Sequence, residues 1–122
     1  MSIKKPSHIV PAETHVRVNK RGDEPVLYVE FHLRDGRVFG FPYSHLMHYR
    51  LEMGTGPEEK LTLEFSRHDV AITGRRFGEL REFLKTGSLA SVAEMDPRYE
   101  NLTSNRPFIS TVTVEPISGA VT

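Results

Sequence analysis

The chain has 122 residues, a length typical of one domain, and 38% of them are apolar, enough to build a core without disulfide or metal support. Its 16 Lys and Arg residues balance 16 Asp and Glu residues, so no overall positive charge favours nucleic acid or an anionic membrane. The absence of cysteine excludes disulfides, thiol nucleophiles and thiolate metal sites.

The two ends of the chain lack the periodicity of regular structure. We expect residues 1–12 to form a flexible tail, residues 13–116 one β-rich globular domain, and residues 117–122 a C-terminal tail. The basic N-terminus leads into Pro11 and Glu13 and not into the apolar run of a signal peptide. No stretch approaches the roughly 20 apolar residues of a membrane-spanning helix. We therefore expect a cytoplasmic protein that has no contact with a membrane.

The clearest pattern is the alternation of apolar and polar residues over 26–43, which predicts a β-hairpin that turns at Asp35-Gly36. A two-residue loop would set two arginines opposite each other. A three-residue loop with Gly36 in the left-handed conformation instead pairs Phe31 with Phe39. We expect this second register, because it builds one apolar face and places Phe39 in the core.

The other elements follow from local patterns. Pro42 cannot donate a hydrogen bond to a neighbouring strand, so residues 43–51 are expected to form a strand end and then a bent or helical turn. Residues 88–95 fit either a short strand or a helical turn. We further predict a first strand at 14–19, a second hairpin from 61–65 and 70–73, an amphipathic helix over about 76–86 ended by Gly87, and a last strand at 108–115.

These elements predict an α+β fold. One curled, mostly antiparallel sheet of about five or six strands would be packed by the single amphipathic helix. A small closed barrel is the variant of this arrangement.

Two histidines and two arginines are the residues with candidate site chemistry. His45 and His48 are three apart, so a helical turn would place both rings on one side. A zinc site needs three or four ligands and no third ligand is identifiable, so we expect no metal, no other cofactor and no catalytic residue. Arg75 and Arg76 precede the predicted helix and are a candidate anion contact. The alternative is that they are solvated charges paired with nearby glutamates.

A candidate interaction surface follows Pro42. Apolar side chains are concentrated there beside an interrupted strand edge, where self-association by strand pairing or packing is physically easy. The alternative is that these side chains close one end of the core. The residues of this surface are Tyr43, Leu46, Met47 and Tyr49.

Two segments carry a family resemblance. Residues 61–86, with Leu63-Glu64-Phe65 and Val70-Ala71-Ile72-Thr73-Gly74-Arg75 followed by helical spacing, resemble short uncharacterised bacterial domains in which two strands run into a Gly-Arg and a helix. Residues 33–42 are similar to the Asp-Gly-Arg hairpin of other small bacterial domains of unknown function. The resemblance implies a bacterial, non-secreted origin and brings no catalytic residue.

Three functions remain open. We expect a non-enzymatic protein-interaction or accessory module that binds a protein partner or forms a homo-oligomer. The first alternative is a small Sm-like barrel that binds nucleic acid through Arg and Tyr side chains, with Tyr28, Tyr43, Tyr49 and Phe39 as a possible stacking platform. The second is a small metal-dependent enzyme that uses His45 and His48.

Overall fold

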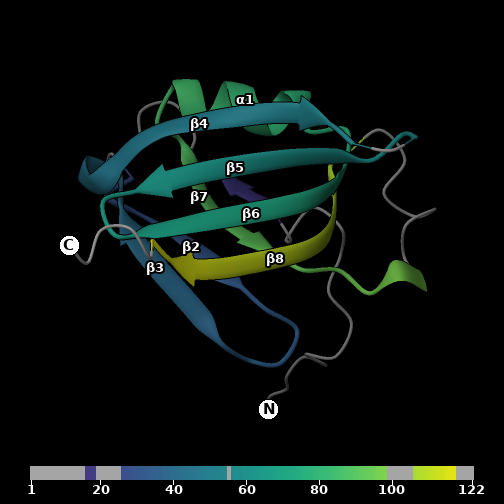
Figure 1. Cartoon of the computed structure of the whole chain (residues 1–122), viewed down its shortest axis with the longest axis horizontal. Coiled ribbons are helices and arrows are strands. Elements are labelled where there is room, and N and C mark those ends of the chain that lie inside the picture. The colour runs from purple at the N-terminus through teal and green to yellow at the C-terminus, as the bar shows by residue number, and fades with distance from the viewer. Residues whose placement is uncertain (1–15, 19–25, 55, 99–105, 118–122) are drawn as a thin grey trace, which may run out of the picture.

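The computed structural model describes residues 16–18, 26–54, 56–98 and 106–117 (Figure 1). The expected tail at 1–12, residues 118–122 and both ends of the predicted first strand lie outside the described residues. The elements are β1 (Val16–Val18), β2 (Tyr28–His32), β3 (Val38–Pro42), a 3₁₀ turn (Tyr43–His45), β4 (Leu46–Met53), β5 (Glu59–Phe65), β6 (His68–Arg75), α1 (Gly78–Lys85), β7 (Leu89–Ala93) and β8 (Phe108–Pro116).

The strands form two four-stranded sheets, ordered β1-β7-β2-β3 and β4-β5-β6-β8. The expected α+β fold with a single sheet of five or six strands is therefore wrong, as is its barrel variant, because the described strands form a mostly β structure of two open sheets. After β3 ends at Pro42, the 3₁₀ turn redirects the chain into the second sheet. Apolar alternation marks strands but does not show which sheet each strand joins.

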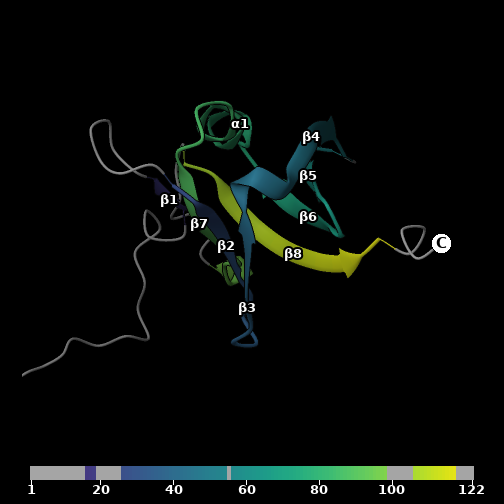
Figure 2. The same ribbon diagram turned by 90° about the vertical axis from the view of Figure 1, so that its left-hand side faces the viewer.

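The first hairpin has the predicted register. Phe31 pairs with Phe39 and Gly36 has a φ of 97°, as the three-residue loop requires. The Leu33 amide donates to the Arg37 carbonyl at 2.9 Å, which closes the loop. The expectation that Phe39 lies in the core is wrong, because its ring is half-buried outside the core cluster. Figure 2 shows the tip of this hairpin projecting beyond the second sheet, where no opposite layer covers it.

The second hairpin, the helix and the last strand are close to their predicted positions. Leu63 of β5 pairs with Val70 of β6, and β8 covers the expected residues. The helix begins two residues later than predicted, at Gly78, and ends as expected beside Gly87, whose φ is 68°. The Ser88 amide donates to the Phe83 carbonyl at 2.9 Å, the hydrogen bond of a Schellman cap.

Strand β4 is the largest local difference from prediction, since residues 43–51 are expected to form a strand end and then a bent or helical turn. Leu46, Tyr49 and Leu51 all pack against the core, but the register against β5 shifts between Leu46 and His48. This β-bulge interrupts the period of two, so the strand lacks its usual sequence signature. Residues 89–93, which fitted two structures, form β7 and pair with β2 in parallel.

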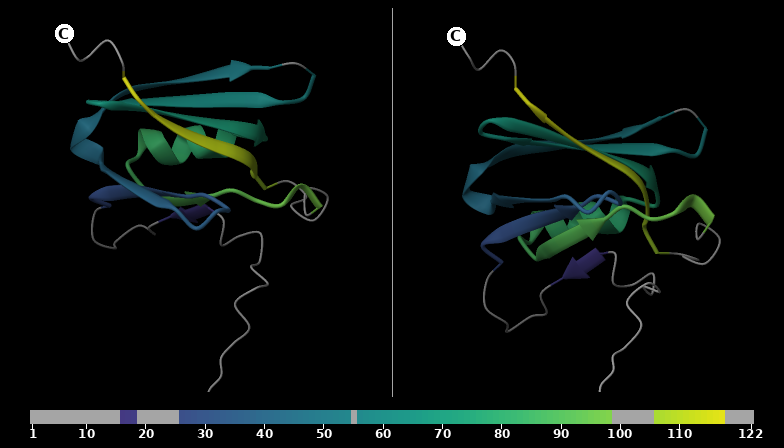
Figure 3. Two further views of the ribbon diagram at one scale, coloured as in Figure 1. Left: turned by 60° about the horizontal axis from the view of Figure 1, so that its bottom comes forward. Right: turned by 90° about the horizontal axis from the view of Figure 1, so that it is seen from below.

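The core lies between the two sheets, with α1 inserted between them (Figure 3). Phe41 of β3 stacks on Phe65 of β5 with ring centroids 4.6 Å apart, and this contact joins the sheets. Leu80 and Leu84 are the buried side chains of the helix. The fully buried residues with the largest side chains are Phe31, Phe65, Phe77, Leu61, Leu63, Ile72, Leu80, Leu89, Met95, Ile109, Val29 and Val70.

Candidate binding surface

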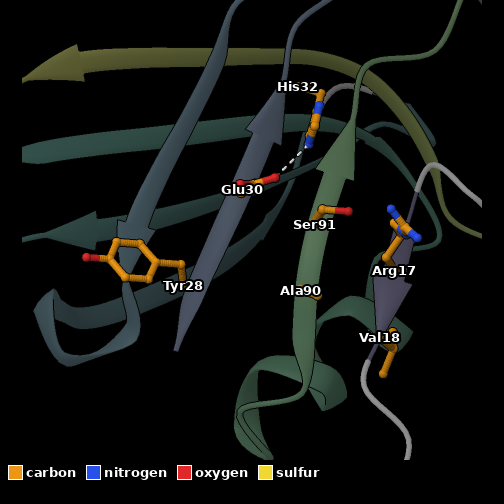
Figure 4. A pocket seen from close by; sticks show the side chains of 7 residues that line it. All are labelled: Arg17, Val18, Tyr28, Glu30, His32, Ala90 and Ser91. Atoms are coloured by element: carbon orange, nitrogen blue, oxygen red, sulfur yellow. Dashed lines mark hydrogen bonds and ion pairs between the residues drawn. The ribbon is translucent and has the colours of Figure 1, made fainter. Parts of the chain in front are cut away.

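A row of polar side chains crosses the outer face of the β1-β7-β2-β3 sheet. The register places Arg17 of β1 opposite Ser91 of β7, and Ser91 opposite Glu30 of β2. Paired residues of neighbouring strands point to the same side of a sheet, so these three side chains share the face turned away from the core. Tyr28 and His32, each two residues from Glu30 on β2, extend the row along the strand (Figure 4).

These side chains surround a shallow hollow of about 410 Å³. Strand β2 forms one side of it, β1 forms the other, and β7 forms its floor (Figure 4). Ser91 is 8% exposed, so the floor is well packed although it is polar. The lining residues are Arg17, Val18, Tyr28, Glu30, His32, Ala90 and Ser91.

The charges of the hollow are unevenly distributed. His32 Nε2 lies 3.2 Å from Glu30 Oε1, so the Glu30 carboxylate already has a hydrogen-bonding partner on its own strand. Within the described part of the chain, no ion pair is formed by the Arg17 guanidinium, which is exposed. Tyr28 is 58% exposed and presents its ring to solvent. The hollow therefore combines a guanidinium that forms no ion pair with any described residue, a hydrogen-bonded Glu30–His32 pair and an exposed aromatic ring.

This arrangement is suited to binding. A guanidinium offers a fork of N–H donors that matches a carboxylate, and an exposed tyrosine ring supplies apolar contact area at a small entropic cost. The His32 ring contacts Glu30, and among the described side chains the Ser91 hydroxyl makes no hydrogen bond to that ring.

The predicted interaction surface is divided between the core and the solvent. Tyr43, Leu46 and Tyr49 pack against the core, whereas Met47 is 68% exposed. The Tyr43 hydroxyl donates to the Leu89 carbonyl at 2.7 Å, and burial raises the pKa of this phenol to about 12. These three side chains contribute to the core where the chain passes from one sheet to the other. The alternative stated from sequence is that they close one end of the core.

The two predicted anion-contact arginines lie between β6 and α1. Arg76 has a φ of 62°, and its Nε donates to the Arg106 carbonyl at 2.8 Å. Arg75 is the last residue of β6 and pairs with Phe108 of β8. Both side chains are half-buried and form part of the connection into the helix.

The two histidines do not share a helical turn. His45 ends the 3₁₀ turn, while His48 lies on β4 with Nε2 2.9 Å from Glu64 Oε1. Glu64 also accepts a 2.8 Å hydrogen bond from Arg50, so this carboxylate contacts an imidazole and a guanidinium on the outer face of the second sheet. Across residues 16–18, 26–54, 56–98 and 106–117, no group of three or more His, Asp or Glu side chains is placed to hold a metal ion.

Sequence reasoning missed the hollow. The polar positions of β2 were visible as the alternate residues of a predicted strand, but the neighbouring positions lie more than 50 residues away on β7. The parallel pairing of β2 with β7 brings Ser91 beside Glu30, and no local pattern predicts it.

The described chain has no helix with the length and apolar character needed to cross a membrane, since α1 contains eight residues. Comparison of the chain with protein-family models, with curated proteins and with solved structures gave no significant match.

Proposed function

We propose that the protein is a non-enzymatic interaction module and that the hollow on its β1-β7-β2-β3 sheet binds an acidic segment of a partner protein. The observation that supports this proposal most strongly is the convergence of Arg17, Ser91 and Tyr28 from three strands on one hollow. Protein interfaces are enriched in tyrosine and arginine, and binding energy concentrates at such residues.

Arg17 supplies the charge preference. No carboxylate among the described residues pairs with it, so a carboxylate from a partner would gain a charge-assisted hydrogen bond without breaking an internal one. The Ser91 hydroxyl lies directly across the strand pair and offers a second donor. On the other side of the hollow, Glu30 and His32 contact each other, so this carboxylate already has a hydrogen-bonding neighbour.

Apolar side chains beside the hollow supply contact area. Tyr28 is 58% exposed and Val38 is 51% exposed. Val38 pairs with His32 in the hairpin register, so it lies on the same outer face. Exposed apolar groups next to a charged anchor match an acidic segment that also carries an apolar residue.

A peptide-display experiment tests this function. Random dodecapeptides are selected on the immobilised full chain, and the enriched peptides are measured for binding by fluorescence anisotropy. We expect enrichment of Asp or Glu next to an aromatic or aliphatic residue, because both parts of the surface would be used. Arg17→Glu should weaken binding by tenfold or more, which corresponds to about 1.4 kcal/mol. Tyr28→Ala should weaken it by a smaller factor.

The matched control is Arg67→Glu, which makes the same charge change in the exposed turn between β5 and β6. It should leave peptide affinity unchanged. Selection of peptides without acidic residues, or of peptides that bind Arg17→Glu as tightly as the original chain, would refute the proposed function.

A further inference from the structure

Strand β4 is one of the two edge strands of the β4-β5-β6-β8 sheet and runs for eight residues (Figure 1). Its register against β5 gives the direction of its backbone groups. The Gly54 amide donates to the Glu58 carbonyl at 2.7 Å, which makes this a hydrogen-bonded pair of the ladder. Hydrogen-bonded and non-hydrogen-bonded pairs alternate in antiparallel strands, so Glu52 and Arg50 also direct their backbone groups toward β5.

The intervening residues point the other way. The backbone N–H and C=O groups of Tyr49, Leu51 and Met53 are directed to the open edge of the sheet. Within the described residues, no hydrogen bond reaches these groups. An edge of this kind is a template for another strand, and β4 contains no proline that would block it.

The side chains of β4 are complementary to themselves. Arg50 and Glu52 both lie on the outer face and are both about half exposed. On the other face, Tyr49 and Leu51 pack against the core, while Met53 is 69% exposed at the end of the strand. A second copy of β4 placed antiparallel to the first can therefore meet opposite charges on one face and apolar groups on the other.

We propose that two copies of this chain associate through antiparallel pairing of their β4 strands, with Leu51 opposite Leu51 of the second copy. In this register Arg50 faces Glu52 of the second copy, and the same contact recurs by symmetry. Tyr49 faces Met53 of the second copy and covers its exposed side chain. Tyr49, Leu51 and Met53 of each copy then donate and accept backbone hydrogen bonds across the new strand pair. The β4-β5-β6-β8 sheets of the two copies become one continuous sheet.

The charges select this register over its neighbours. A shift of the symmetry centre to Arg50 would place the two arginines opposite each other, and a shift to Glu52 would do the same with the two glutamates. Like charges directly opposite each other destabilise a strand pair. The association uses the β4-β5-β6-β8 sheet, so it goes beyond the peptide hollow on the other sheet and does not depend on it.

The test is the solution mass of the full chain, measured by light scattering and sedimentation from about micromolar to about millimolar concentration, the range in which weak dimers form. The monomer mass is 13.9 kDa, and the proposal predicts a reversible shift to twice that value. Glu52→Arg should raise the dimer dissociation constant by at least tenfold, because it sets arginines against each other. Adding Arg50→Glu to that variant should restore dimerisation.

A second variant tests the backbone pairing. Met53→Pro removes an amide that points to the open edge, so the β4–β5 ladder keeps its hydrogen bonds while the dimer loses two by symmetry. Far-ultraviolet circular dichroism checks that the fold is intact. Glu115→Arg, the same charge change on β8, is the control and should leave the dimer unchanged. A monomer at every concentration, or a dimer unaffected by both Glu52→Arg and Met53→Pro, would overturn the proposal.

Discussion

The two outer strands of the β4-β5-β6-β8 sheet differ in how their open edges are treated. On β8, the Val112 amide donates to Glu94 Oε2 at 2.7 Å, and the Ile109 carbonyl accepts the Met95 amide at 2.8 Å. On β4, the edge-directed backbone groups of Tyr49, Leu51 and Met53 have no hydrogen-bond partner within the described residues. These two bonds leave β8 a shorter run of outward groups that another strand could pair with. Among the described residues, β4 therefore has the longer open edge of the two.

The largest effect is expected from Gly74 of β6, which has no room for a side chain beside the Phe108 carbonyl of β8. A Cβ at this position would collide with the Phe108 carbonyl oxygen and lie 2.9 Å from Phe77 Cζ, and all three residues are buried. Gly74→Ala should lower the free energy of unfolding by about 3 kcal/mol, because backbone and a buried ring must both move. Urea denaturation measures this loss.

Gly78→Ala is the control for that substitution. A Cβ at Gly78 meets nothing within 4 Å, and alanine favours the helix that begins there. Gly78→Ala should therefore leave stability unchanged or raise it slightly. Equal losses at the two positions would show that the approach of β8 at Gly74 is not the source of the effect.

Substitution of Glu94 tests whether its carboxylate stabilises the outer edge of β8. Its carboxylate accepts the Val112 amide and, through Oε1, the Arg34 amide at 2.9 Å, so it ties β8 to the end of the first hairpin. Glu94→Ala should cost about 2 kcal/mol in urea denaturation, since two charge-assisted hydrogen bonds are lost. Glu94→Gln keeps one acceptor oxygen and should lose less.

Opening the β8 edge should also change association. The Glu94→Ala variant is expected to self-associate more strongly than the original chain, through an edge that Glu52→Arg does not affect. Light scattering of the double variant Glu94→Ala with Glu52→Arg measures this. An unchanged mass would contradict the idea that Glu94 protects β8.

The smallest effect is expected at Tyr43, just before β4, where the chain crosses between the sheets. Removal of its hydroxyl in Tyr43→Phe leaves the Leu89 carbonyl without that donor and should cost about 1 kcal/mol at neutral pH. Burial raises the pKa of this phenol from 10.0 to about 12, so the folded chain holds the proton more tightly than the unfolded chain. The stabilisation is complete below pH 10 and is lost as the pH rises toward 12.

The measurement is the difference in unfolding free energy between the original chain and Tyr43→Phe across that pH range. The difference should shrink between pH 10 and 12. A difference that stays constant over this range would show that burial does not raise the pKa of this phenol.

Local patterns predicted much of the secondary structure but not the arrangement of the sheets. The register of the first hairpin, the second hairpin, the end of the helix at Gly87 and strand β8 depend on neighbouring residues, and each was found. The division into two sheets was not predicted, because it depends on the 3₁₀ turn after Pro42 and on the bulge that hides β4.

The binding hollow required information that the local pattern lacks. Arg17, Ser91 and Glu30 are far apart in the chain and become neighbours through the pairing of β7 with both β1 and β2. Conversely, the apolar residues Tyr43, Leu46 and Tyr49 beside an interrupted strand edge predict an interaction surface, whereas their partly buried side chains pack against the core. Hydrophobicity alone does not distinguish an exposed apolar patch from the end of a core.

Hydrogen exchange of the β4 amides tests the open edge most directly. At low concentration, the amides of Tyr49, Leu51 and Met53 should exchange rapidly, while the Val112 amide is protected by Glu94. At high concentration, β4 pairing should slow exchange at those three positions and leave the edge of β8 unchanged. An equal exchange rate for the Leu51 amide at both concentrations would contradict the pairing of β4 with a second copy.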